Sequence, residues 1–102
     1  MIFTVTTLFI NKKEKLIVRS QPWGYFFDQQ SAAESIINNI EDLFEEGYYN
    51  HAVIEKISEG ILGSCKKIQW YQAEKIKDKN CLEIKPVSEP SFLKRYVRFW
   101  AG

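Results

Sequence analysis

The residues best suited to chemistry are one histidine, His51, and two cysteines, Cys65 and Cys81. A nucleophilic cysteine needs a histidine beside it, and a zinc site needs about four ligands at short spacing. The sequence shows no zinc spacing, and whether either cysteine folds against His51 is open. We predict no metal site, no cofactor and no catalytic residue. His51 is expected to be a hydrogen-bonded packing residue, and both thiols are expected to be reduced and structural.

Two further chemical patterns are incomplete. Residues 60–64, Gly-Ile-Leu-Gly-Ser, contain two glycines but lack the lysine of a phosphate loop, so no such loop is predicted. Glu55 interrupts an apolar run, where it would face solvent or pair with a lysine of a neighbouring strand. No two carboxylates are spaced as a specific acid–base pair. The sequence therefore favours a binding protein over an enzyme.

Length and composition indicate a single folded domain over residues 1–102. The chain is 45% apolar and 15% aromatic, too short for two independent cores but apolar enough to fold. This composition excludes a disordered tail. Fourteen lysines and arginines oppose thirteen aspartates and glutamates, a formal net charge of +1. That balance excludes a strongly basic nucleic-acid binder and a uniformly acidic mimic of DNA.

The small net charge hides two regions of opposite sign. No lysine or arginine lies between Arg19 and Lys56, and the seven acidic residues of that stretch give it a formal charge of −7. The rest of the chain has fourteen basic residues against six acidic ones, a formal charge of +8. We therefore expect one acidic and one basic surface on the folded domain.

The acidic surface is expected at the end of a helix. Four carboxylates fall in the last turns of a helix predicted over residues 31–46, where each costs about 0.3–1 kcal/mol against the helix dipole. They also form like-charge pairs four residues apart. Carboxylates that oppose the helix dipole and repel one another, with no visible compensation, are typical of a functional site. A solvated helix face would show the same pattern. The candidate partner-binding residues are Glu41, Asp42, Glu45 and Glu46.

A second candidate surface is basic and aromatic. Lysines and arginines are interleaved with tryptophan and tyrosine on the later predicted strands, which suits base stacking beside phosphate contacts. Alternatively, the rings fill the core while the lysines face water. The residues proposed for nucleic-acid or nucleotide binding are Lys66, Lys67, Trp70, Tyr71, Lys94, Arg95 and Arg98.

One helix and several strands must position these surfaces. Ser31 and Glu34 fit a capping box, and Gly47 is expected to end the helix in a left-handed conformation. Strands are predicted over residues 2–10, 16–20, 52–57, 66–75 and 81–85, with a further one suggested over 94–100. Gln21 and Pro22 are expected to end the second strand. The helical stripe predicted to pack on the sheet is Ala33, Ile36, Ile37, Ile40, Leu43 and Phe44.

The order of these elements is β-β-α-β-β-β. Loops of hairpin length favour an antiparallel sheet, and one amphipathic helix then covers one face. The expected fold class is α+β, a two-layer domain with an antiparallel sheet of about five strands and one main helix. The longest apolar stretch, residues 1–10, has about half the length that spans a bilayer. No membrane segment is therefore predicted, and a cytoplasmic location is expected.

Several segments resemble a group of short uncharacterised single-domain proteins of phages, prophages and gut bacteria. The shared features are Ser-Ala-Ala-Glu at 31–34, Ile-Glu-Asp-Leu-Phe-Glu at 40–45, the segment 48–55, Gly60 and the pair Trp70-Tyr71, within residues 25–72. The resemblance brings no known activity and no site residues. It implies a phage-linked accessory protein, such as an inhibitor of a bacterial defence system, in the bacterial host cytosol.

We therefore expect a small non-enzymatic binding protein whose acidic helix surface docks a protein partner with a basic surface. Carboxylates on a rigid helix can occupy a groove that otherwise receives nucleic-acid phosphates. The alternative is nucleic-acid or nucleotide binding through the basic, aromatic face of the sheet. A homo-oligomer stays open, because edge strands can pair between chains.

Overall fold

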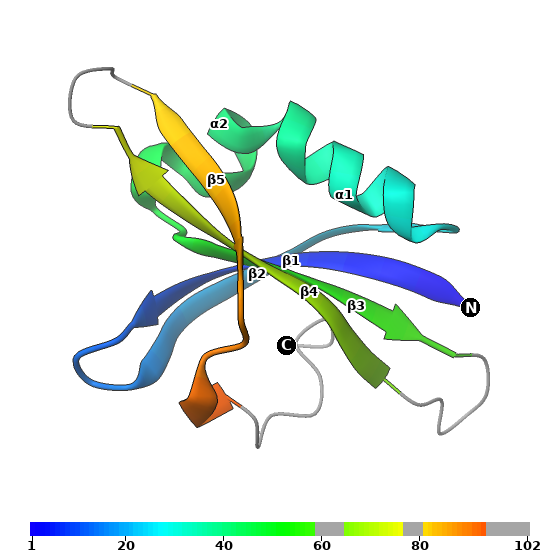
Figure 1. Ribbon diagram of the computed structural model, residues 1–102, viewed down its shortest axis with the longest axis horizontal. Coiled ribbons are helices and arrows are strands. Elements are labelled where there is room, and N and C mark those ends of the chain that lie inside the picture. The colour runs from blue at the N-terminus through cyan, green and yellow to red at the C-terminus, as the bar shows by residue number, and fades with distance from the viewer. Residues whose placement is uncertain (59–64, 77–80, 94–102) are drawn as a thin grey trace.

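In the computed structural model, the described residues are 1–58, 65–76 and 81–93 (Figure 1). Within them the chain forms five strands, two α-helices and two short 3-10 turns. The strand suggested over 94–100 lies outside this part of the chain. The elements in chain order are β1 (Ile2–Asn11), β2 (Leu16–Phe26), α1 (Gln29–Asn38), α2 (Ile40–Phe44), η1 (Glu45–Gly47), β3 (His51–Ile57), β4 (Cys65–Lys75), β5 (Leu82–Val87) and η2 (Ser91–Leu93).

The strands form one antiparallel sheet with the spatial order β2-β1-β3-β4-β5. Figure 1 shows both helices on one side of this twisted sheet. The predicted α+β class, the antiparallel sheet and the covering helix are confirmed. The spatial order differs from the order along the chain, because β1 lies between β2 and β3 and not at an edge. Residues 4–8 of β1 are all buried, as expected for an inner strand with both faces covered.

Strand β2 continues past Pro22, where the sequence predicts its end. Pro22 pairs with Thr6 and the next pair joins Gly24 to Val5, so Trp23 is an extra residue in a β-bulge. A proline has no N–H for the ladder, but β2 is an edge strand, where a bulged proline is tolerated. The prediction that Gln21 and Pro22 end this strand is wrong for that reason.

The single helix predicted over residues 31–46 is two helices in the structure, and the first of them begins at Gln29, two residues before the predicted start. The Asp28 carboxylate accepts hydrogen bonds from the Ser31 backbone N–H at 2.7 Å and from the Ser31 hydroxyl at 3.0 Å. These bonds, the backbone one first, hold the pKa of Asp28 below its ordinary value. Asp28 is thus the N-cap of α1, and the capping box predicted for Ser31 and Glu34 is wrong.

The break between the helices lies at Asn39. Its backbone leaves the helical region (φ −128°, ψ 32°), and its side-chain amide donates to the Ser35 carbonyl at 2.7 Å. α2 ends at Phe44, and Glu45 takes the left-handed conformation with φ 45°. Gly47 has a positive φ of 106°, as predicted, but it closes the 3-10 turn η1 and not a long helix.

The helices pack on one face of the sheet around a first apolar cluster, together with strand residues such as Val5 and Ile54. Ile37 is 53% exposed, so its predicted burial is wrong. Adjacent helical residues lie about 100° apart, and α1 buries only a narrow stripe of residues spaced four apart. Ala33 and Ile40 are half-buried against the cluster. The fully buried helix residues are Ala32, Ile36, Leu43 and Phe44.

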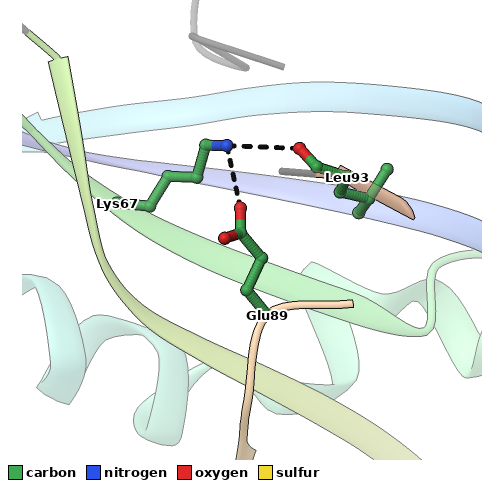
Figure 2. A network of polar contacts seen from close by, with 3 residues as sticks. All are labelled: Lys67, Glu89 and Leu93. Carbon is green, nitrogen blue, oxygen red and sulfur yellow. Dashed lines mark hydrogen bonds and ion pairs between the residues drawn. The ribbon is translucent and has the colours of Figure 1, made fainter. Parts of the chain in front are cut away.

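The opposite face carries a second, smaller apolar cluster. The segment after β5 packs on this face, and Lys67 of β4 binds it (Figure 2). Lys67 Nζ lies 2.8 Å from Glu89 Oε1 and donates to the Leu93 carbonyl at 3.3 Å. Residues thus pack on both faces of the sheet, whereas the sequence predicts cover on one. The second cluster consists of Leu8, Ile10, Val53, Trp70 and Leu93, with Ile17, Val87 and Phe92 against it.

Candidate functional site

The helix break changes the electrostatic position of the acidic residues. Glu41 and Asp42 lie in the first turn of α2, where the partial positive charge of a helix N-terminus favours carboxylates. The prediction that all four carboxylates crowd a helix C-terminus is therefore wrong for these two. Glu45 and Glu46 follow the end of α2, in η1. Repulsion by the helix dipole thus gives no argument for function at Glu41 and Asp42.

Asp42 belongs to an apolar pocket between the helices and the β1–β2 hairpin, termed here the helix pocket. The pocket has a volume of about 240 Å³ and is lined by Val5, Trp23, Phe26, Ser35, Asn39, Asp42 and Leu43. Among these lining residues, Asp42 alone carries a charge. An apolar pocket with one carboxylate can receive a side chain that has an apolar stem and a cationic end.

The β-bulge of β2 provides one wall of the helix pocket. Trp23 is the extra residue, and its indole N–H donates to the Thr7 hydroxyl at 2.7 Å. The Trp23 side chain is 38% exposed, so a ligand can reach it. Sequence reasoning missed Trp23, because a bulge resets the alternation of a strand and leaves no local signal. Two more aromatic residues, Tyr25 and Phe27, are exposed at this sheet edge and contact each other edge-on at 5.9 Å.

Carboxylates surround the end of α2. Glu41, Asp42 and Glu45 are all exposed, and the short span from α2 to η1 brings them to one end of the helical layer. The Leu82 N–H donates to Glu41 Oε1 at 3.4 Å, which joins α2 to the edge strand β5. Burial raises the pKa of Tyr49, and the Glu45 carboxylate raises it further. The predicted acidic residues with described side chains are therefore close in sequence and exposed, but Asp42 faces the β2 side of the helical layer and Glu41 the β5 side.

The basic, aromatic residues do not form one surface in the described part of the chain. Trp70 and Tyr71 are neighbours on β4, and successive strand side chains point to opposite faces. Trp70 is 3% exposed within the second cluster, and Tyr71 packs half-buried against the first, where burial raises its pKa. Lys66 is exposed, whereas Lys67 forms the ion pair of Figure 2. The other candidates, Lys94, Arg95 and Arg98, lie outside the described residues.

His51 is a buried packing residue, and Cys81 is a half-buried free thiol. His51 Nδ1 lies 2.7 Å from Asn50 Oδ1, in line with the expected hydrogen-bonded role. Burial, together with the charge of Lys12, lowers the pKa of His51 to about 4. Across residues 1–58, 65–76 and 81–93, no three histidine, cysteine or acidic side chains are grouped to hold a metal ion. No helix within the same residues is long and apolar enough to cross a membrane.

No protein-family model, curated protein or solved structure matches this chain. The resemblance to phage and gut-bacterial proteins therefore stays a prediction. The helix pocket, which Asp42 lines, is the arrangement closest to the predicted acidic site.

Proposed function

We propose that the protein is a small non-enzymatic binding protein that docks a basic protein partner on its helical side. The observation that carries the proposal is the helix pocket, where Asp42 stands among the apolar walls of Val5, Trp23 and Leu43. A lysine or arginine of the partner would place its aliphatic stem against these walls and its charge beside the carboxylate. The other acidic residues of the predicted site, Glu41, Glu45 and Glu46, belong to α2 and η1.

The charge distribution supports a basic partner. Residues 20–55 contain no lysine or arginine, and they include both helices and η1. A surface of one sign speeds association with an oppositely charged partner and makes the affinity sensitive to salt. The same surface disfavours nucleic acid on the helical side, because phosphates would meet carboxylates there.

The resemblance to phage-linked proteins indicates what kind of basic partner the protein would bind. An inhibitor of a bacterial defence system in the host cytosol would have to cover a surface that otherwise contacts nucleic acid. Such surfaces are rich in lysine and arginine, because they neutralise phosphates. An acidic docking surface on packed helices fits that role and requires neither a cofactor nor catalysis.

The test measures binding of a cationic peptide that alternates lysine with leucine to the wild-type chain. The Trp23 indole N–H resonance provides a readout inside the helix pocket. We expect saturable binding that shifts this resonance and weakens as the salt concentration rises from about 0.05 to about 0.5 M. Asp42→Lys should weaken the affinity by about tenfold, the equivalent of about 1.4 kcal/mol, because it places like charges together.

Glu34→Lys is the matched control for this experiment. Glu34 is an exposed carboxylate on α1 that does not line the helix pocket. The same charge reversal there should change the peptide affinity by less than about threefold. Equal losses in the two variants would show that the peptide senses only net charge. A Trp23 resonance that stays unshifted at saturating peptide would overturn the proposal.

The alternative, nucleic-acid or nucleotide binding through the basic sheet surface, predicts a different pattern. A mobility shift of RNA or single-stranded DNA that Lys66→Gln weakens and Asp42→Lys leaves intact would favour it. The burial of Trp70 removes one of the rings proposed for stacking. Self-association through the exposed aromatic edge of β2 would instead appear as a mass that rises with protein concentration.

A further inference from the structure

A second pocket lies beside the β1–β2 turn, on the sheet face opposite the helices, and is termed the turn pocket. It has a volume of about 310 Å³, at the lower end for sites that take small molecules. Its walls come from the turn, β3, β4 and the segment after β5, so only the folded sheet assembles it. The lining residues used below are Lys12, Lys15, His51, Gln72 and Phe92.

The mouth of the turn pocket is positively charged. Lys12 and Lys15 both line it, and no acidic residue is among its described lining residues. Lys12 Nζ donates to the Gln72 side-chain oxygen at 3.4 Å, which holds the ammonium at the pocket. Lys15 has φ 55°, a left-handed conformation that glycine or asparagine would adopt more readily.

The buried wall of the turn pocket offers a hydrogen-bond acceptor. Asn50 Oδ1 accepts from the Ile10 N–H at 2.9 Å, and Asn50 Nδ2 donates to the Ile10 carbonyl at 3.0 Å. These two bonds fix the orientation of the Asn50 amide, so His51 Nδ1 beside Oδ1 has to carry the proton. Because His51 has a pKa of about 4, its ring is neutral at pH 7, and Nε2 is an acceptor.

A third wall is apolar and held in place. Phe92 lines the pocket within the segment that follows β5. The Lys67–Glu89 ion pair fastens this segment to β4, and Leu93 is fully buried in the second cluster (Figure 2). A wall fixed before binding lowers the ordering cost that a ligand has to offset.

We propose that the turn pocket binds a small organic phosphate of the nucleoside monophosphate type. Lys12 and Lys15 hold the phosphate, because a dianion between two ammonium groups gains charge-assisted hydrogen bonds. A hydroxyl or N–H of the ligand donates to His51 Nε2, and its flat apolar part lies against Phe92. A ligand therefore needs a phosphate, a hydrogen-bond donor and a flat apolar part to contact all three walls of the turn pocket. The turn pocket shares no lining residue with the helix pocket, so this proposal is independent of the docking proposal.

The test titrates adenosine monophosphate, adenosine and inorganic phosphate separately into the wild-type chain. The ring nitrogen resonances of His51 report on the pocket. We expect adenosine monophosphate to shift the Nε2 resonance saturably, and the other two probes to bind about tenfold more weakly or worse. The double variant Lys12→Gln with Lys15→Gln should weaken adenosine monophosphate by about tenfold, because the phosphate loses both of its cations.

Lys13→Gln is the matched control for the double variant. Lys13 lies in the same turn and is exposed but does not line the pocket, so its removal should leave the affinity unchanged. Thermal unfolding within about 2 °C of wild type would show that both variants keep the fold. A His51 resonance that stays unshifted up to about 10 mM adenosine monophosphate would refute the proposal. Equal binding of adenosine, or equal affinity in the double variant and Lys13→Gln, would refute it too.

Discussion

The two faces of the sheet bury different kinds of side chain. Beneath the helices the buried residues are mostly apolar, with Ile36, Phe44 and Ile54 fully buried, and Thr7, which accepts from Trp23, is a buried polar residue on that side. On the opposite face, strand alternation places polar side chains next to apolar Leu8 and Val53. The buried polar residues on that face are Thr4, Thr6, His51 and Glu55. The first face therefore contributes stability through burial, whereas the second combines burial with groups that need partners in fixed directions.

This difference between the faces separates the residues that mainly stabilise the domain from the buried polar residues that can recognise a ligand. Apolar burial is non-directional, whereas buried polar groups require hydrogen-bond partners at defined positions. The turn pocket lies on the polar face, and one of its walls is a buried histidine. The helix pocket lies at the rim of the apolar face, where recognition depends on carboxylates at the surface. Variants can therefore damage one face and spare the other.

The largest effect is expected for Ile36→Asp on the helical face. Ile36 is fully buried in the first cluster, so the substitution removes apolar contacts and places a carboxylate in the core. A loss of about 5 kcal/mol or more is comparable to the whole stability of a small domain. We expect no cooperative unfolding transition by circular dichroism at 25 °C.

Ile37→Asp is the matched control, one residue along the same helix. Ile37 is half exposed, so the same substitution should change the free energy of unfolding by less than about 0.5 kcal/mol. If the two variants melt alike, the helix is rotated relative to the sheet, and the helical face is assigned wrongly.

The next effect is a pH dependence that belongs to the opposite face. His51 is neutral in the folded chain with a pKa of about 4, whereas the unfolded chain binds a proton near pH 6.5. The contribution of neutral His51 to the free energy of unfolding is therefore complete above pH 6.5, and it is lost as the pH falls to about 4. The loss amounts to about 3 kcal/mol at most, at 1.36 kcal/mol per pKa unit.

His51→Gln isolates this contribution from that of the carboxylates, which also titrate in acid. The difference in the free energy of unfolding between wild type and variant should shrink as the pH falls from 6.5 to 4, measured by urea unfolding. A difference that stays constant over this range would mean that His51 is solvated in the folded chain.

A smaller effect is expected for Lys67→Met, which removes the ammonium that holds the segment after β5. Lys67 and Glu89 have 14% and 26% exposed side chains, so their ion pair is partly shielded from water. We expect a loss of about 1.5–2 kcal/mol in urea unfolding, at the lower end for hydrogen bonds to charged groups. Lys66→Met, at the exposed neighbouring position, should change stability by less than about 0.5 kcal/mol. Equal effects would show that the contact in Figure 2 adds no stability.

The sequence predicts the strands well, because their signals are local. Alternation and β-branched residues predict β3 over 52–57 and β4 over 66–75, and the structure has His51–Ile57 and Cys65–Lys75. The helical break escapes prediction, because Asn39 interrupts an otherwise regular apolar spacing with a side-chain bond to Ser35. That break corrects the electrostatic argument for Glu41 and Asp42.

The two pockets could not be predicted, because each joins segments that are distant along the chain. The helix pocket needs Trp23, which a bulge places opposite Asp42 of a later helix. The turn pocket joins Lys12, His51 and Phe92, whose proximity depends on the strand order. Single-sequence patterns report neither bulges nor strand order, since both are decided by contacts between distant residues.

Asn50, which orients His51, also has a consequence for the dynamics of the sheet. Its backbone N–H donates to the Leu8 carbonyl and its own carbonyl accepts from the Ala73 N–H, both at 3.0 Å, while its side chain pairs with Ile10. One residue thereby links β1, β3 and β4 at a single level of the sheet. In amide hydrogen exchange, the N–H groups of these residues should open together as one cooperative unit. Because the contacts join distant parts of the chain, this junction should be among the later parts of the sheet to form during folding.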